Sequence, residues 1–221
     1  MKSIRATHEH EWEAAPGLPE PLPAGEKILW QGAPDWYALA VHAFHVRKVA
    51  CYFGLWMLWQ AISLRADGAD GVQILIDVTL SLTLSLVALS LLCMVAWWSA
   101  STTLYTLTDK RLVMRVGIVL SLTFNFPLRC IRGAHIKALA HKRADIALQL
   151  PPGDRIGWFH LWPHQRAWHV KHPQPTLRCV DHGELVGELL QRTWAKAQAP
   201  GTAAVVQSPA PQTPNELGLV A

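Results

Sequence analysis

Cysteines and recognisable catalytic signatures are what this sequence most clearly lacks. Its 221 residues include four cysteines, and no two of them form a CxxC pair. Cysteines scattered in this way exclude a disulfide framework or a zinc finger as the organising feature of the fold. The sequence also has no P-loop, no nucleophile elbow and no pair of carboxylates in a segment with regular periodicity. We therefore expect a protein that is not an enzyme and that uses no metal ion or other cofactor.

Charged residues are scarce as well, at 16% of the chain, and the stretch Val72–Trp98 contains just one, Asp77. The uncharged part, Val78–Trp98, has about 21 residues, which is enough to cross a bilayer as a helix. A lone strand could not satisfy its backbone hydrogen bonds in lipid, so length and environment predict a transmembrane helix. Asp77 then lies at one membrane edge, and Trp97 and Trp98 lie at the other edge, where indole rings are favoured.

A second apolar run, Val49–Leu64, precedes this span, and the polar residues 65–71 are too few for anything but the turn of a helical hairpin. We expect residues 49–98 to form a transmembrane hairpin, which makes the protein multi-pass. Basic residues lie outside both ends of the hairpin, whereas its turn has more acidic than basic residues. The positive-inside rule then places both termini in the cytoplasm. The flanking basic residues are Arg47 and Lys48 before the hairpin and Lys110, Arg111 and Arg115 after it.

The second span has two small polar faces, one with Thr79 and Thr83 and one with Ser81 and Ser85. Small polar residues permit close helix contact and interhelical hydrogen bonds. One face suffices for the first span, so we expect the Ser81 and Ser85 face to be available to a partner helix, including that of a second copy in a homodimer. The alternative is that these hydroxyls bond only to carbonyls of their own helix.

Two tryptophans of the first span, Trp56 and Trp59, lie at a depth where this residue is unusual. We expect them to pack on the other helix of the hairpin rather than to contact a pigment or another protein.

The segment before the hairpin, residues 26–48, is aromatic and then basic. Asp35 is a cap-like residue before Trp36–Val46, whose apolar residues have helical spacing and whose histidines and cations form a basic side. We expect an interfacial helix that leads into the membrane. His42 and His45 could ligate a pigment or haem, but they stand beside two cations rather than inside an apolar span, so we favour hydrogen bonding to headgroups or a partner.

After the hairpin, the hydrophobic period becomes two, which predicts successive antiparallel strands closed by a helix over Asp181–Lys196. Asp181 and Glu184 fit a capping box for that helix. The last strand candidates are separated by a proline-rich loop that holds His164, His169 and His172, whose irregular spacing is not typical of a zinc site. The expected strands are Leu104–Thr108, Arg111–Val116, Ile118–Phe126, Cys130–Leu139, Asp145–Leu150, Arg155–Leu161 and Thr176–Val180.

Two resemblances to known families follow from these residues. The run Tyr105–Gly117 looks like the opening hairpin of the bacterial PH-like family, which implies a PH-like antiparallel β-sandwich or barrel capped by a C-terminal helix. Leu22–Trp36, His42–Ala50 and Leu161–His164 resemble PuhB, the family of photosynthetic complex assembly proteins of purple bacteria. That resemblance implies a non-enzymatic assembly factor for the reaction centre and light-harvesting 1 complex in the inner, intracytoplasmic photosynthetic membrane.

The expected organisation is therefore α+β, with a transmembrane hairpin inserted in an otherwise water-exposed chain. Its parts are a flexible lead (1–25), the aromatic segment and interfacial helix (26–48), the hairpin (49–98), the PH-like domain (102–197) and a disordered tail (198–221). We expect partner contacts, to reaction-centre or light-harvesting 1 polypeptides, at Trp30, Trp36, His42, Phe44, His45, Arg47, Lys48, Ser81 and Ser85. We expect membrane-interface contacts at Trp97, Trp98, Lys110, Arg111 and Arg115.

Charge is distributed unevenly along the chain. The first 35 residues carry three basic and six acidic side chains, whereas residues 99–197 carry 14 basic and six acidic ones. A basic domain next to a membrane is typical of contact with anionic lipids, so we do not expect nucleic acid as a partner. An alternative function, a lipid- or pigment-binding membrane module, stays open. The turn Asp109–Lys110 is too short for the headgroup pocket of phosphoinositide-binding PH domains.

Overall fold

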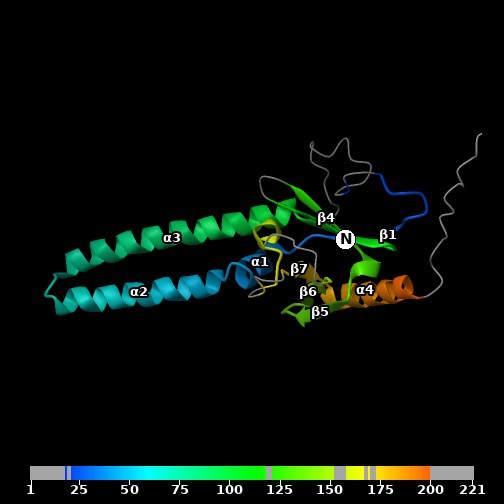
Figure 1. The fold of residues 1–221 in the computed structure, drawn as a ribbon. Coiled ribbons are helices and arrows are strands. Elements are labelled where there is room, and N and C mark those ends of the chain that lie inside the picture. Colours follow the sequence, from blue (N-terminus) through cyan, green and yellow to red (C-terminus); the bar gives the residue numbers. More distant parts are fainter. Residues whose placement is uncertain are drawn as a thin grey trace, which may run out of the picture.

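The computed structural model consists of a long helical hairpin and a β domain at its open end (Figure 1). It describes residues 18, 21–117, 121–151, 158–166, 169 and 173–199. Most of the expected flexible lead, His172 and almost all of the expected disordered tail lie outside the described residues.

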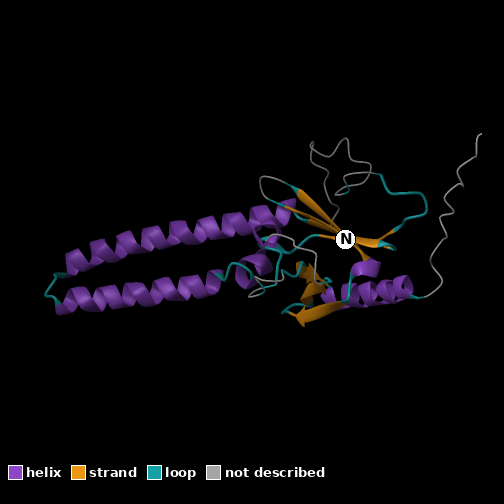
Figure 2. Cartoon of the chain, viewed as in Figure 1, coloured by secondary structure: helices purple, strands orange, loops and turns teal. Residues whose placement is uncertain are grey.

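The hairpin pairs helix α2 (Val46–Ala66) with helix α3 (Gly71–Thr102), and the two lie side by side along their length (Figures 1 and 2). Asp70 is the N-cap of helix α3, and its carboxylate accepts the backbone N–H of Gln73 at 2.8 Å. By length and composition, α3 is the one described helix that could cross a membrane, with a mean hydropathy of 2.3 in its most apolar part. The two helices pair as expected, but the transmembrane hairpin is corrected to one candidate span, α3, because polar and charged residues of α2 lower its hydropathy.

A short helix, α1 (Trp36–His42), precedes the hairpin. The predicted cap is confirmed, since the Asp35 carboxylate accepts the N–H of Ala38 at 2.8 Å. The helix ends at His42 instead of Val46, because His45 adopts a left-handed conformation (φ 55°) from which α2 starts anew. Its apolar side, including Leu39, is buried against α3 and the β domain. An interfacial helix would rest its apolar face in lipid, but here protein covers that face, which corrects the expectation.

The first sheet has the antiparallel order β1-β2-β3-β4. Its strands are β1 (Ile28–Gly32), β2 (Leu104–Thr108), β3 (Arg111–Val116) and β4 (Leu122–Pro127). Strands β2 and β3 have the bounds expected from the sequence. Strand β1 was not expected, and it pairs with β2 although the whole hairpin lies between them in the chain. Both ends of the hairpin are therefore attached to the same sheet.

The second sheet has the order β5-β6-β7, and helix α4 packs against it. The elements are β5 (Gly133–Ala138), β6 (Arg143–Gln149), β7 (Thr176–Asp181) and α4 (Gly183–Gln198), with short 3-10 turns η2 (Leu128–Cys130) and η3 (Trp158–Leu161). The core lies between the two sheets and α4, where residues such as Leu148, Leu177 and Leu190 are almost fully buried. These antiparallel sheets and the C-terminal helix confirm the α+β expectation.

Two local expectations in this part are corrected. The described part of the expected strand Arg155–Leu161 is the 3-10 turn η3. Helix α4 has His182, in a left-handed conformation, at its N-cap, with no side-chain cap hydrogen bond. Asp181 does not cap the helix because its carboxylate pairs with Arg143 instead.

Candidate functional site at the junction of the hairpin and the β domain

A buried polar cluster joins the end of α3 to the β domain, and its centre is His164. This side chain is fully buried. Its Nδ1 lies 2.7 Å from the hydroxyl of Tyr105 on β2, and its Nε2 lies 3.0 Å from the hydroxyl of Thr103 and 3.3 Å from that of Ser99. The imidazole thus connects the last turn of α3, the first strand after it and the loop before β7.

The hydrogen-bond partners determine where the protons lie. The Tyr105 oxygen accepts the backbone N–H of Arg178 at 3.1 Å, so its own proton is donated to Nδ1 of His164. The ring proton is therefore on Nε2 and is donated to Thr103, whose hydroxyl donates in turn to the carbonyl of Ser99 at 2.7 Å. Every polar atom of the histidine ring is satisfied, which makes the cluster a rigid joint rather than a reactive centre.

Electrostatics support this interpretation. Burial, with a smaller contribution from the charge of Arg178, lowers the pKa of His164 to about 3, so the imidazole is neutral at physiological pH. Burial also raises the pKa of the Tyr105 hydroxyl far above its usual range, and it raises the pKa of the Cys179 thiol to about 12. An imidazole with a pKa of about 3 is a very weak base, and a thiol with a pKa of about 12 forms almost no thiolate at neutral pH, so neither group is suited to catalysis there.

A second tie connects the segment before α1 to the second sheet. Arg143 on β6 lies 3.1 Å from the Asp35 carboxylate and 3.0 Å from that of Asp181. Asp35 also donates its backbone N–H to the carbonyl of Cys179 at 3.1 Å. Near the other end of β1, Arg111 pairs with the buried carboxylate of Glu26 at 2.8 Å. These contacts fix the start of the hairpin to the domain just as the histidine cluster fixes its end.

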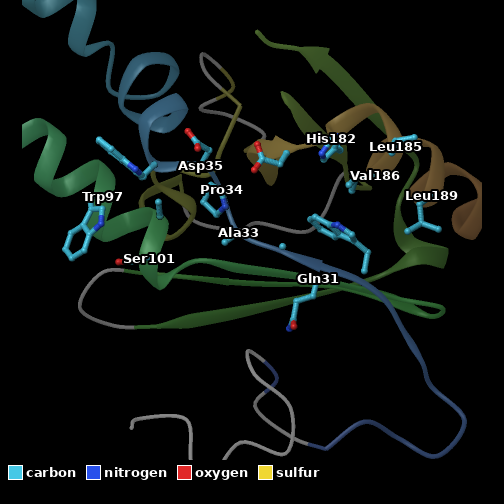
Figure 3. A pocket seen from close by; sticks show the side chains of 15 residues that line it. Gln31, Ala33, Pro34, Asp35, Trp97, Ser101, His182, Leu185, Val186 and Leu189 are labelled. Atoms are coloured by element: carbon cyan, nitrogen blue, oxygen red, sulfur yellow. The ribbon is translucent and has the colours of Figure 1, made fainter. Parts of the chain in front are cut away.

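A groove of about 680 Å³ lies between α3, α4 and the segment that leads from β1 into α1. Trp97 and Ser101 of α3 lie on one side, Leu185 and Leu189 of α4 lie on the other, and Ala33–Asp35 runs between them (Figure 3). Leu185 is 63% exposed here.

The aromatic residues expected to bind a partner are divided between the core and the surface. Trp30 packs partly buried against the domain core, and its ring lies over Gly32 so closely that a Cβ there would collide with it. Phe44 contacts the ring of Trp162 edge-to-face at 5.4 Å. Trp36 stays 45% exposed. Of these three, Trp36 alone offers a large free surface.

The basic residues of the same segment surround the start of α2. His42 is partly buried, and its pKa is lowered chiefly by that burial. His45, Arg47 and Lys48 are exposed. Arg47 donates to the hydroxyl of Tyr37 at 3.0 Å and lies over its ring.

The small polar residues of α3 face in the direction opposite to our expectation. Ser81 donates to the side chain of Gln60 on α2 at 2.7 Å, and Ser85 is buried. The face that we assigned to a partner helix is therefore covered by α2, and the exposed one carries Thr79 and Thr83. The alternative that these hydroxyls bond to their own helix is also present, since Ser85 and Thr83 each donate to the carbonyl four residues earlier.

The tryptophans of α2 are exposed, which corrects the expectation that they pack inside the hairpin. Trp56 is 52% exposed and Trp59 is 67% exposed, and Tyr52 and Leu55 join them on the outer surface. Sequence reasoning missed this surface because aromatic spacing does not show which side of a helix its neighbour covers.

The residues expected at the membrane interface separate into two groups. Trp97 and Trp98 are about half exposed near the end of α3. Arg115 pairs in register with Leu104 and so lies at the same end of the sheet. Lys110 in the turn and Arg111 at the start of β3 lie at the far end of the β2–β3 hairpin, roughly 13–16 Å farther along the strand. Their assignment to the interface stays a prediction, and they lie farther from the end of α3 than Arg115 does.

Among the described residues, no group of three or more histidine, cysteine, aspartate or glutamate side chains is arranged to hold a metal ion. His164, which sequence reasoning weighed as a zinc ligand, is the structural centre of the joint. It is the last residue of Leu161–His164, one of the segments that carry the family resemblance, and this was the available signal in the sequence.

Comparison with known proteins adds the family. Residues 54–192 match the family described as Bacterial PH domain. The chain is a bacterial PH domain protein. It is 35% identical over 185 residues to a protein of Rhodobacter capsulatus described as an uncharacterized 23.7 kDa protein in the puhA 5′ region, and the alignment covers 83% of this chain and 86% of that protein. No solved structure matches. The family match begins within α2, so this bacterial PH domain protein shares with the family part of its hairpin and the strands β2 to β7.

Proposed function

We propose that this bacterial PH domain protein is a non-enzymatic assembly factor for the photosynthetic reaction centre and the light-harvesting 1 complex. It acts by protein–protein contacts in and on the inner membrane, with both hairpin helices in the bilayer and both termini in the cytoplasm. Its relative in the puhA 5′ region of a purple bacterium and its resemblance to photosynthetic assembly proteins support this proposal.

The observation that carries the proposal is the exposed aromatic stripe of α2, formed by Tyr52, Trp56 and Trp59. These positions repeat at helical spacing and therefore lie on one side of the helix. Trp56 lies ten residues into α2, about 15 Å along a bilayer core of about 30 Å. Tryptophan favours the edges of a bilayer, so mid-span indoles are better explained by contact with another protein helix, where aromatic side chains dominate binding energy.

The β domain supports this role by fixing the hairpin. Both hairpin ends are tied to the β domain, by the Asp35–Arg143 ion pair at one end and by the His164 cluster at the other. A stripe held in this way presents the same surface to each incoming polypeptide, which lowers the entropy cost of binding.

The experiment is a mild-detergent pull-down of tagged protein from photosynthetically grown cells, with mass spectrometry and absorption spectra of the eluate. We expect reaction-centre or light-harvesting 1 polypeptides at substoichiometric levels, and we expect the double substitution Trp56→Leu, Trp59→Leu to reduce them severalfold. The matched control, Leu80→Ala with Leu84→Ala, changes the outer side of α3, whose two leucines are similarly exposed. Recovery of neither class of polypeptide would overturn the proposal, and so would recovery of a second copy of this chain alone.

The alternative of a pigment-binding module has less support. No histidine occurs between Val46 and Thr102, so neither helix of the hairpin offers an imidazole ligand to a pigment metal. Stoichiometric bacteriochlorophyll in the purified protein would favour that alternative.

A further inference from the structure

A basic pocket lies on the outer face of the second sheet, away from the core. It has a volume of about 370 Å³. The pleat of the paired strands brings alternate residues of β5, β6 and β7 to this face, while Ile146 and Leu177 point to the core. Its charged lining consists of Lys137, Arg166 and Arg178 against the single carboxylate of Asp145, with His135 nearby.

The guanidinium of Arg178 has weak protein contacts. The residue is 9% exposed, and its two Nη atoms donate to the carbonyls of Gln165 and His42 at 3.3 and 3.4 Å. Its Nε lies 3.7 Å from Asp145 and has no hydrogen-bond partner among the described residues. The Asp145 carboxylate already accepts the N–H of Cys179 at 2.8 Å. A buried guanidinium with such long contacts at the wall of a net positive pocket is suited to an anion.

With the hairpin placed in the bilayer as proposed, the pocket lies at the depth of lipid headgroups. Arg178 contacts Gln165, whose neighbour His164 is bonded to Ser99 and Thr103. Those two residues follow the tryptophan pair of α3 by no more than about 8 Å of helix. The polar layer of a bilayer is about 5–8 Å thick on each side. On the other side, Arg178 contacts His42, just before the start of α2.

We propose that this pocket binds the phosphate group of an anionic phospholipid of the cytoplasmic leaflet. Lys137 and Arg166 contact the phosphate oxygens from the rim, and Arg178 supplies charge from the wall. Arginine binds phosphate in two-pronged geometry, and basic pockets beside membrane helices are typical sites for anionic headgroups. The inference goes beyond the assembly role but rests on the membrane placement of the hairpin within it.

The test is calorimetric titration of the full-length protein in neutral detergent with short-chain phosphatidylglycerol, and separately with inorganic phosphate. We expect one saturable site for the lipid and much weaker binding of phosphate alone. The double substitution Lys137→Gln, Arg166→Gln should weaken lipid binding at least about tenfold, since each basic residue near an anionic headgroup contributes about fivefold. Both side chains lie at the pocket rim, so unchanged thermal stability would show that the fold is intact.

The matched control is Arg132→Gln with Lys196→Gln, which removes the same charge from exposed positions outside the pocket. We expect less than about a twofold change for the control. Equal weakening by both double variants would show diffuse charge attraction and overturn the proposal. Equally tight binding of inorganic phosphate would replace the lipid with a soluble anion, and lack of saturable binding would refute the site itself. If deletion of the gene leaves photosynthetic complexes unchanged, the assembly role fails while the calorimetric result stands.

Discussion

The hydroxyl of Tyr105 provides a sharp test of the buried joint. Replacing Tyr105 by phenylalanine keeps the ring but removes one oxygen that serves two buried partners, Nδ1 of His164 and the N–H of Arg178. Each buried group that loses its hydrogen bond costs about 1–3 kcal/mol, so we expect the variant to lose about 3 kcal/mol of folding free energy. For a chain of this size that corresponds to a fall in Tm of roughly 6–12 °C.

The assay is thermal unfolding of full-length protein in mild detergent, followed by near-ultraviolet circular dichroism. The matched control is Tyr37→Phe, which removes a hydroxyl that accepts from Arg47 on a side chain that is 50% exposed. We expect the control to unfold within about 2 °C of the wild type, because exposed interactions of this kind contribute little. A Tyr105→Phe variant as stable as the control would refute the argument that the cluster stabilises the junction.

Three further predictions concern the same elements. His164 has a pKa of about 3 in the folded chain, whereas in the unfolded chain it binds a proton near pH 6.5. The free energy of unfolding should therefore fall by about 1.4 kcal/mol per pH unit as the pH drops from 6.5 to 3. Denaturant unfolding measures this dependence, and His164→Gln should flatten it. Gly183→Ala should cost about 1–3 kcal/mol in the same assay because its Cβ would collide with the backbone of β6, whereas Gly54→Ala, in open space on α2, should not destabilise; equal effects would refute the packing argument. Ser81→Ala removes a hydrogen bond to Gln60 and should weaken the hairpin by less than about 2 kcal/mol in detergent-unfolding titrations, and no measurable loss would show that the interhelical bond contributes nothing.

Features set by local sequence could be predicted from it. The period-two runs gave the bounds of β2 and β3, and the Asp35 cap followed from its position before an apolar helix. The hairpin followed from two apolar runs around a short polar turn, although α3 alone meets the length and composition of a membrane span. Each of these signals needs only neighbouring residues.

Features that depend on distant partners could not be predicted. Strand β1 has too little alternation to be recognised alone, and it forms because the edge of β2 is free to pair with it. Asp181 fits a capping box in sequence, but Arg143 on another strand takes its carboxylate. The two polar faces of α3 are equivalent in sequence, and Gln60 on α2 decides which of them is covered.

The same limit applies to the candidate site. His164 reads as a loop histidine in sequence, and its role depends on hydroxyls at the end of α3 and on β2. The basic pocket gathers Lys137, Arg166 and Arg178 from three separate segments. These side chains come together because of the register of the second sheet and the course of the loop before β7, which neighbouring residues in the sequence do not reveal.

The measurement that tests the central claim most directly is photo-crosslinking in living cells from a photoreactive amino acid at Trp59, on the exposed stripe of α2. Assembly through this stripe predicts crosslinks to a reaction-centre or light-harvesting 1 polypeptide while the complexes are being made, and none from the same probe at Leu84 on the outer side of α3. Crosslinks from Trp59 to lipid or to this chain alone, in cells that are actively building photosynthetic complexes, would contradict it.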